Sequence, residues 1–217
     1  MYINTHTFYS LRYGTISPEA LLQLAKKSGV QRFALTDINN TSACLEVVRL
    51  SKKYNIKPVL GVDFRNGAQQ EFVILARNNN GFLNINNYLS ELLHQPRFKA
   101  PQQAPFLEDT FVIYPFGKQG QFELKKHEFL GVSPFQVNHL LFSKWNQRLD
   151  KLVVLQTVSF KNKKGLKAHR LLRAIDNNML LSKLPKEEQG REEHIMLPIA
   201  TVNYPAPRAL GFTYQTT

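Results

Sequence analysis

The chain has 217 residues, of which 43% are hydrophobic and 11% aromatic, as expected for one sizeable globular domain or one domain with an insertion. Its single cysteine, Cys44, excludes an internal disulfide and a zinc site built from several thiolates, and the lack of a signal sequence or long apolar run predicts a cytoplasmic protein without a membrane span. The net charge of +12 favours polyanionic partners such as nucleic acid, although many basic proteins never bind one.

Roughly the first 95 residues alternate strand and helix patterns. Ser17 is a good helix N-cap, Pro18 suits the first helical position, and Gly29 and Asn55 can end helices. The continuous apolar run at 72–75 is typical of a buried parallel strand. We predict strands at 3–6, 32–37, 58–64 and 71–76, helices starting at Pro18, after a Thr41 or Ser42 cap and at Phe82, and a turn at 78–81. This alternation favours βα units around a parallel sheet or barrel.

The second half of the chain is less regular. Residues 95–105 contain three prolines and predict a surface loop. Strand patterns return at 110–114, 128–132 and 152–156, and an amphipathic helix is predicted at 166–175. Four residues share the predicted apolar face of that helix: Leu166, His169, Leu172 and Ile175. We expect one domain over residues 1–217, with an insertion or loop region at about 95–150.

The first three predicted strands each have a polar residue at their carboxyl end, namely His6, Asp37 and Asp63. In an α/β barrel the carboxyl ends of the strands meet at one mouth, where such side chains can hold a metal ion. One histidine and two aspartates could bind at most one divalent metal weakly; the alternative is a set of hydrogen-bonded polar residues. We expect no other cofactor and no catalytic residue, because Ser10 and Cys44 have no companion base that the sequence places beside them.

Four segments carry a family pattern. They are residues 4–11 (Asn-Thr-His-Thr-Phe-Tyr-Ser-Leu), 34–40 (Ala-Leu-Thr-Asp-Ile-Asn-Asn), 56–63 (Ile-Lys-Pro-Val-Leu-Gly-Val-Asp) and 74–84 (Ile-Leu-Ala-Arg-Asn-Asn-Asn-Gly-Phe-Leu-Asn). In this order they resemble His-x-His-Ser-x-Tyr-Ser-Leu, Ala-Leu-Thr-Asp-His-Gly-Asn, Ile-Lys-Pro-Ile-Ile-Gly-x-Glu and Leu-Leu-Ala-Lys-Asn-x-x-Gly-Tyr-x-Asn. These are motifs of the PHP domain (polymerase and histidinol phosphatase), in the version found at the N-terminus of bacterial DNA polymerase III alpha subunits.

The resemblance implies an α/β fold, specifically a distorted (β/α)7 TIM-like barrel of the PHP type. Members of the family bind up to three metal ions, but several ligand positions differ here. Asn4 and Ile38 replace histidines, Asp63 replaces glutamate, and Thr157 and Ser159 stand where the last motif has its two ligands. The implied function is therefore a degenerate PHP domain with a structural or scaffolding role in DNA replication, within a polymerase that is itself a nucleotidyltransferase.

Two other functions remain open. One is a metal-dependent phosphoesterase or 3′-5′ exonuclease with a reduced metal site, and the other is a free-standing nucleic-acid-binding module. The expected partners are the remainder of the polymerase alpha subunit, DNA, or a proofreading or other replisome subunit. A basic cluster could contact nucleic acid or be a solvated face; it comprises Lys161, Lys163, Lys164, Lys167 and Arg170.

Overall fold

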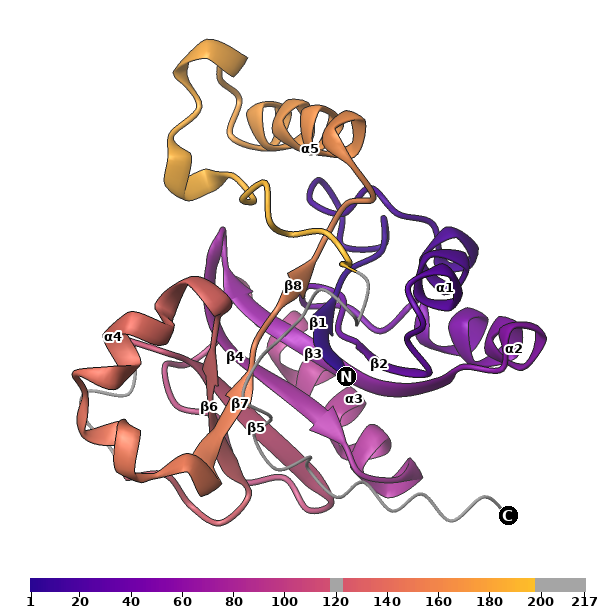
Figure 1. Cartoon of the computed structure of the whole chain (residues 1–217). Coiled ribbons are helices and arrows are strands. Elements are labelled where there is room, and N and C mark those ends of the chain that lie inside the picture. The colour runs from indigo at the N-terminus through magenta and orange to yellow at the C-terminus, as the bar shows by residue number, and fades with distance from the viewer. Residues whose placement is uncertain (118–122, 198–217) are drawn as a thin grey trace.

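The computed structural model describes residues 1–117 and 123–197. One curled sheet contains eight strands in the order β7-β6-β5-β4-β3-β2-β1-β8 (Figure 1). Their bounds are β1 Tyr2–Thr5, β2 Arg32–Leu35, β3 Lys57–Asn66, β4 Gln69–Ala76, β5 Thr110–Pro115, β6 Glu128–Val132, β7 Leu152–Val154 and β8 Thr157–Val158. Neighbouring strands are parallel except where β4 meets β3 and β5. The predicted α/β class is confirmed, and β5 and β6 fall inside the region at 95–150.

The prediction that the fourth strand is parallel is wrong. β4 runs antiparallel to both of its neighbours. It follows β3 through a two-residue turn at Gly67 and Ala68, where Gly67 has a φ of 61°, as tight hairpin turns require. The apolar run at 72–75 reports that the strand is buried on both faces. Burial on both faces is common in parallel sheets, but it does not determine strand direction.

The two end strands of the sheet are close in sequence. Only Leu155 and Gln156 separate β7 from β8, yet β7 pairs with β6 and β8 pairs with β1. The backbone N–H of Leu155 also donates to the carbonyl of Val132, at 2.9 Å. One extended segment, residues 152–158, therefore pairs with β6 through its first half and with β1 through its second half.

The described residues form five α-helices, of which the first four lie between strands and the last follows β8: α1 Pro18–Lys27, α2 Cys44–Tyr54, α3 Asn79–Leu93, α4 Val137–Leu141 and α5 Lys163–Asp176. The predicted Ser17 cap and the left-handed Asn55 stop are confirmed. The predicted cap of the second helix is wrong, because α2 begins after Ala43 and the Thr41 hydroxyl donates instead to Asn86. The predicted turn at 78–81 is also wrong: the Asn78 side chain accepts from the Gly81 N–H and starts α3 there.

The predicted apolar face of α5 is correct only in part, because Leu166 and Leu172 are half-buried and His169 is buried, but Ile175 is not. The helix buries His169, Arg173 and Ala174, while Ile175 is 60% exposed. The polar ends of His169 and Arg173 find hydrogen-bond partners inside the protein. A hydrophobicity pattern cannot identify a face that is buried through satisfied polar groups.

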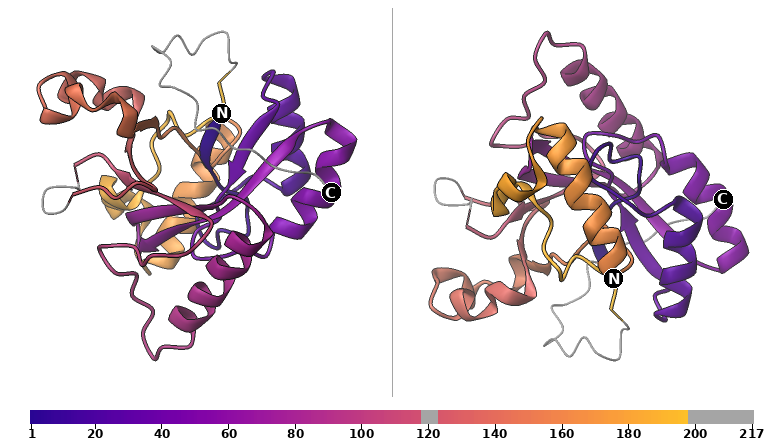
Figure 2. Two further views of the ribbon diagram at one scale, coloured as in Figure 1. Left: turned by 90° about the horizontal axis from the view of Figure 1, so that it is seen from below. Right: turned by 90° about the horizontal axis from the view of Figure 1, so that it is seen from above.

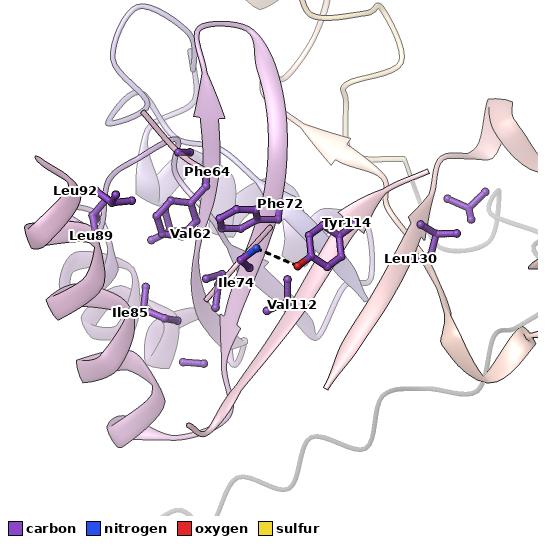
Figure 3. Close-up of a cluster of buried hydrophobic side chains, with 14 of the residues drawn as sticks. Val62, Phe64, Phe72, Ile74, Ile85, Leu89, Leu92, Val112, Tyr114 and Leu130 are labelled. Atoms are coloured by element: carbon purple, nitrogen blue, oxygen red, sulfur yellow. Dashed lines mark hydrogen bonds between the residues drawn. The ribbon is translucent and has the colours of Figure 1, made fainter. Parts of the chain in front are cut away.

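Apolar side chains fill both faces of the sheet. An inner cluster takes one or two residues from most strands, and an outer cluster packs α3 on β3, β4 and β5 (Figure 3). The inner cluster consists of Ile3, Ala34, Val59, Val73, Leu75, Ile113, Val153 and Leu155. Seen from above, α5 lies over the middle of the molecule, and the other helices lie around it (Figure 2). Within residues 1–117 and 123–197, no helix is both long and apolar enough to cross a membrane.

Candidate functional site

The three predicted metal ligands lie at one end of the sheet, and all are buried. His6 follows β1, Asp37 follows β2 by two residues, and Asp63 lies within β3. His6 contacts Asp63 directly. Asp37 bonds instead to Thr7 and Ser10, in the loop after β1. The structure therefore brings two of the three residues together and engages the third separately.

The His6 ring is held by three side chains. Its Nε2 atom lies 3.0 Å from Asp63 Oδ2 and 3.1 Å from Asn4 Oδ1, and its Nδ1 atom lies 2.9 Å from Ser159 Oγ. Both neighbours of Nε2 are acceptors, so Nε2 carries the proton and Nδ1 accepts from the serine hydroxyl. Burial lowers the pKa of His6, which favours this neutral form.

Ser159, His6 and Asp63 thus form a serine–histidine–aspartate chain that the sequence did not predict. Such a chain can activate a serine nucleophile when a substrate can reach the hydroxyl. Here all three residues are 0% exposed, and the backbone N–H of Ser159 donates to the carbonyl of His194. The arrangement therefore holds the site together and offers no accessible nucleophile. Cys44 is no alternative, because burial raises the pKa of its thiol to about 12.

Neutral residues at positions where the family motifs carry ligands belong to this network. Asn4 Nδ2 donates to the hydroxyl of Thr157, at 3.0 Å, and Asn4 Oδ1 accepts from the hydroxyl of Thr36, at 2.8 Å. Together with the Ser159 contact to His6, these bonds connect the ends of β1, β2 and β8. Three of the substituted positions, Asn4, Thr157 and Ser159, therefore stabilise one another without a metal ion.

Asp63 has a second partner that sequence reasoning missed. Arg65 Nε and Nη2 lie 2.9 and 2.7 Å from Asp63 Oδ2. Burial alone would raise the pKa of Asp63, but the charge of Arg65 and the bond to His6 outweigh burial and lower it to about 2. Residues two apart on a strand point to the same face, so the Asp63-x-Arg65 spacing was the available signal.

Asn39 fixes the backbone at Arg65. Its side chain accepts from the Arg65 N–H and donates to the Arg65 carbonyl, both at 3.0 Å. Asn39 has a φ of 49°, a conformation that asparagine tolerates better than most residues. The corresponding position of the family motif is glycine, so this departure preserves the backbone shape and adds two hydrogen bonds.

These contacts do not fit a hydrolytic metal centre. Asp37 Oδ1 accepts from the Thr7 N–H and the Ser10 hydroxyl, both at 2.6 Å, and its Oδ2 accepts from the Thr7 hydroxyl at 2.7 Å. The guanidinium of Arg65 already supplies the positive charge beside Asp63. In the described parts of the chain, no group of three or more histidine, cysteine or acidic residues could hold a metal ion.

Removing the Asp37 carboxylate should destabilise the domain. In Asp37→Ala the N–H of Thr7 and two hydroxyl groups lose their acceptor inside the protein. An unpaired buried donor costs about 1–3 kcal/mol, so we expect a loss of at least that size in urea denaturation. Asp150→Ala is the matched control, because the Asp150 side chain is 67% exposed. Equal stability of the two variants would contradict a structural role for Asp37.

The basic cluster lies at the same end of the sheet as the site. Lys163, Lys164 and Lys167 are exposed on α5, Lys161 precedes the helix, and Arg170 is half-buried. Among residues 1–117 and 123–197, none of the four lysines forms an ion pair. Leu171 is 53% exposed on the same helix. The surface of α5 therefore combines positive charge with apolar side chains.

Comparison with known proteins agrees with the motifs. A sequence profile of the PHP domain matches residues 3–129. The DNA polymerase III subunit alpha of Ureaplasma parvum is 25% identical over 179 residues, which cover 82% of this chain and 16% of that protein. The corresponding subunit of Staphylococcus aureus is 32% identical over 120 residues, covering 52% and 11%. The chain thus spans less than a fifth of the length of these relatives.

Among solved structures, a putative metal-dependent phosphoesterase from Bifidobacterium adolescentis is 13% identical, with a TM-score of 0.36 over 92% of this chain and 93% of that one. The assignment of this chain to a family rests on the sequence profile, which matches more than half of the chain. This chain belongs to the PHP domain family.

Proposed function

We propose that the chain is a degenerate PHP domain of a bacterial replicative DNA polymerase III alpha subunit, a cytoplasmic protein, in which it has a structural role and no hydrolytic activity. The observation that carries the proposal is that both oxygens of Asp37 are engaged by Thr7 and Ser10. Metal-assisted hydrolysis needs carboxylates that are free to hold a cation with an open coordination position.

We also propose that the curled sheet is a TIM-like barrel. The segment at 152–158 pairs with β6 through β7 and with β1 through β8. The inner apolar cluster takes side chains from β1, β2, β3, β4, β5 and β7, as expected when strands surround a common interior. Counting 152–158 as one strand leaves seven strands around that interior, the number in the PHP barrel.

The test combines metal analysis with nuclease assays. The purified chain is loaded with Mn²⁺ or Zn²⁺, passed through a desalting column and analysed for bound metal. It is then incubated with 3′-labelled single-stranded DNA and with p-nitrophenyl phosphate. We expect no stoichiometric metal and no release of product. Two or more metal ions per chain, or exonuclease activity that His6→Ala abolishes, would instead support the metal-dependent phosphoesterase.

The lysines at and before the start of α5 are exposed and form no ion pair with any described residue, which favours a second candidate function, nonspecific DNA contact. Nucleic-acid backbones attract such clusters without base recognition. We propose this contact for Lys161, Lys163, Lys164, Lys167 and Arg170. Such a DNA contact is compatible with a domain of a polymerase subunit and with a free-standing nucleic-acid-binding module. Leu171 is exposed on the same helix, and an exposed apolar side chain suits a protein partner. A binding test that finds no DNA contact would therefore favour a protein partner.

Salt dependence should reveal the DNA contact. Replacing Lys161, Lys163 and Lys164 together by alanine should reduce the slope of log affinity against log salt by about two to three, because each phosphate contact on duplex DNA contributes about 0.9. Fluorescence anisotropy with labelled duplex at several salt concentrations measures the slope. The control replaces Lys26, Lys27 and Lys52, which are exposed on α1 and α2. Equal slopes in both triple variants would assign the cluster to solvent or to a protein partner.

A further inference from the structure

Arg65 is a buried cation at the centre of the site. Its side chain is 5% exposed, and its guanidinium lies over the ring of Tyr13, with the central carbon 4.8 Å from the ring centroid. The charge of Asp63 holds the pKa of Arg65 above its usual value although burial opposes this. The guanidinium therefore stays charged although it is buried, and the carboxylate of Asp63 is its counter-ion.

The contact between Arg65 and Asp63 is one-sided. Nε and Nη2 both reach Oδ2, which also receives the Nε2–H of His6. Asp63 Oδ1 is buried and has no hydrogen-bond partner. A buried carboxylate oxygen without a donor is costly, and arginine commonly avoids that cost by contacting both oxygens of a carboxylate. The site thus retains acceptor capacity that the arginine does not use.

We propose that Arg65 is the resident cation of this site and takes the electrostatic place of a bound metal. When the substitution Arg65→Ala removes the guanidinium, the space that it leaves is a binding site for a small exogenous cation. The preferred ligand class is guanidinium and its alkyl derivatives, which can restore the contacts to Asp63 and Tyr13. This inference rests on the proposed function, because it assumes a metal site whose chemistry has been lost.

Neighbouring side chains support a site that selects cations. Tyr13 offers its ring face to Arg65, and a second guanidinium, that of Arg173, lies 5.7 Å from the same ring. Aromatic faces attract cations, most strongly where water is excluded. Arg173 is already paired with Asp176 and Glu188, so it cannot replace Arg65 without breaking those contacts. Removing Arg65 therefore leaves Asp63 as a buried anion without a cation.

The test is chemical rescue of Arg65→Ala. We expect a lower Tm than wild type, and a saturable rise in Tm on adding methylguanidinium at low millimolar concentration, with ionic strength held constant by NaCl. Wild type should not respond, nor should Arg65→Met, whose side chain fills the space. The control Arg77→Ala removes an exposed guanidinium that lies over Phe111. If Arg65→Ala does not fold alone, the yield of refolded protein with and without methylguanidinium replaces the Tm.

The outcomes separate this inference from the proposed function. A rise in Tm confined to Arg65→Ala supports the resident cation. The absence of rescue, or an equal response of Arg77→Ala, would overturn it while leaving the nuclease result untouched. A parallel titration with MnCl₂ tests the metal alone: stabilisation by Mn²⁺ but not by methylguanidinium would overturn the guanidinium preference. Exonuclease activity of the wild type would contradict the proposed function without affecting the rescue.

Discussion

Asp63→Ala is expected to lower the free energy of unfolding by about 3–5 kcal/mol, because it leaves a buried guanidinium without its anion. Asp63 and Arg65 are 0% and 5% exposed, and the bonds between them are 2.7 and 2.9 Å long. The substitution also removes one of the two acceptors at His6 Nε2. Urea denaturation followed by circular dichroism measures the change.

A double variant tests the physical reason for this loss. Asp63→Ala combined with Arg65→Met removes both charges and should recover much of the stability that the single change loses. The control is Asp150→Ala, since Asp150 pairs with Arg148 and both side chains are exposed. If the double variant is as unstable as Asp63→Ala, the loss comes from packing around His6 and not from an uncompensated charge.

The stability of the domain should fall as the pH drops from about 6.5 to about 4, because His169 must remain neutral. Its Nδ1 atom lies 2.7 Å from the Tyr13 carbonyl and so donates, and its Nε2 atom accepts from the Gly190 N–H at 2.6 Å. Burial lowers the pKa of His169 to about 4. The unfolded chain binds the proton below about 6.5, so stability is full above that pH and is lost as the pH falls through the folded pKa.

The expected loss from His169 alone is on the order of 3 kcal/mol, at 1.36 kcal/mol for each pKa unit. Urea midpoints between pH 7.5 and 4.5 measure it. Burial also lowers the pKa of His6 and of His194, so the wild-type curve contains their contributions in the same direction. His169→Gln should therefore flatten part of the curve, whereas the control His94→Gln, on an exposed residue, should not. Equal curves for both variants would contradict the assignment.

Local signals predicted most elements of this fold. Ser17 accepts from the Ala20 N–H, and Asn55 takes the left-handed conformation, as their residue types indicate. The direction of β4 was missed because it depends on a tight turn at Gly67, while the apolar run reports only burial. The buried face of α5 was predicted only in part, because Arg173 is buried through its ion pairs, and one of its partners, Glu188, lies beyond the helix.

The site was predictable in its residues but not in its contacts. The positions of His6, Asp37 and Asp63 at one end of the sheet follow from strand order, which the motifs indicated. The bond between His6 and Ser159 joins residues 153 positions apart, and no local pattern specifies such a contact. Arg65 lies outside the four family motifs. Its role as the counter-ion of Asp63 depends on its burial beside that residue, which only the folded chain shows.

The short segment that carries β7 and β8 has a consequence for biosynthesis. β1 is made first, but its second neighbour, β8, is made some 150 residues later. A nascent chain that has emerged only to residue 129, where the family match ends, would present β1 with an open edge, the kind of edge that recruits strands from other molecules. Asn4 and His6 would also lack Thr157 and Ser159. Deletions that stop short of residue 159 should therefore yield aggregates, whatever they retain of the site.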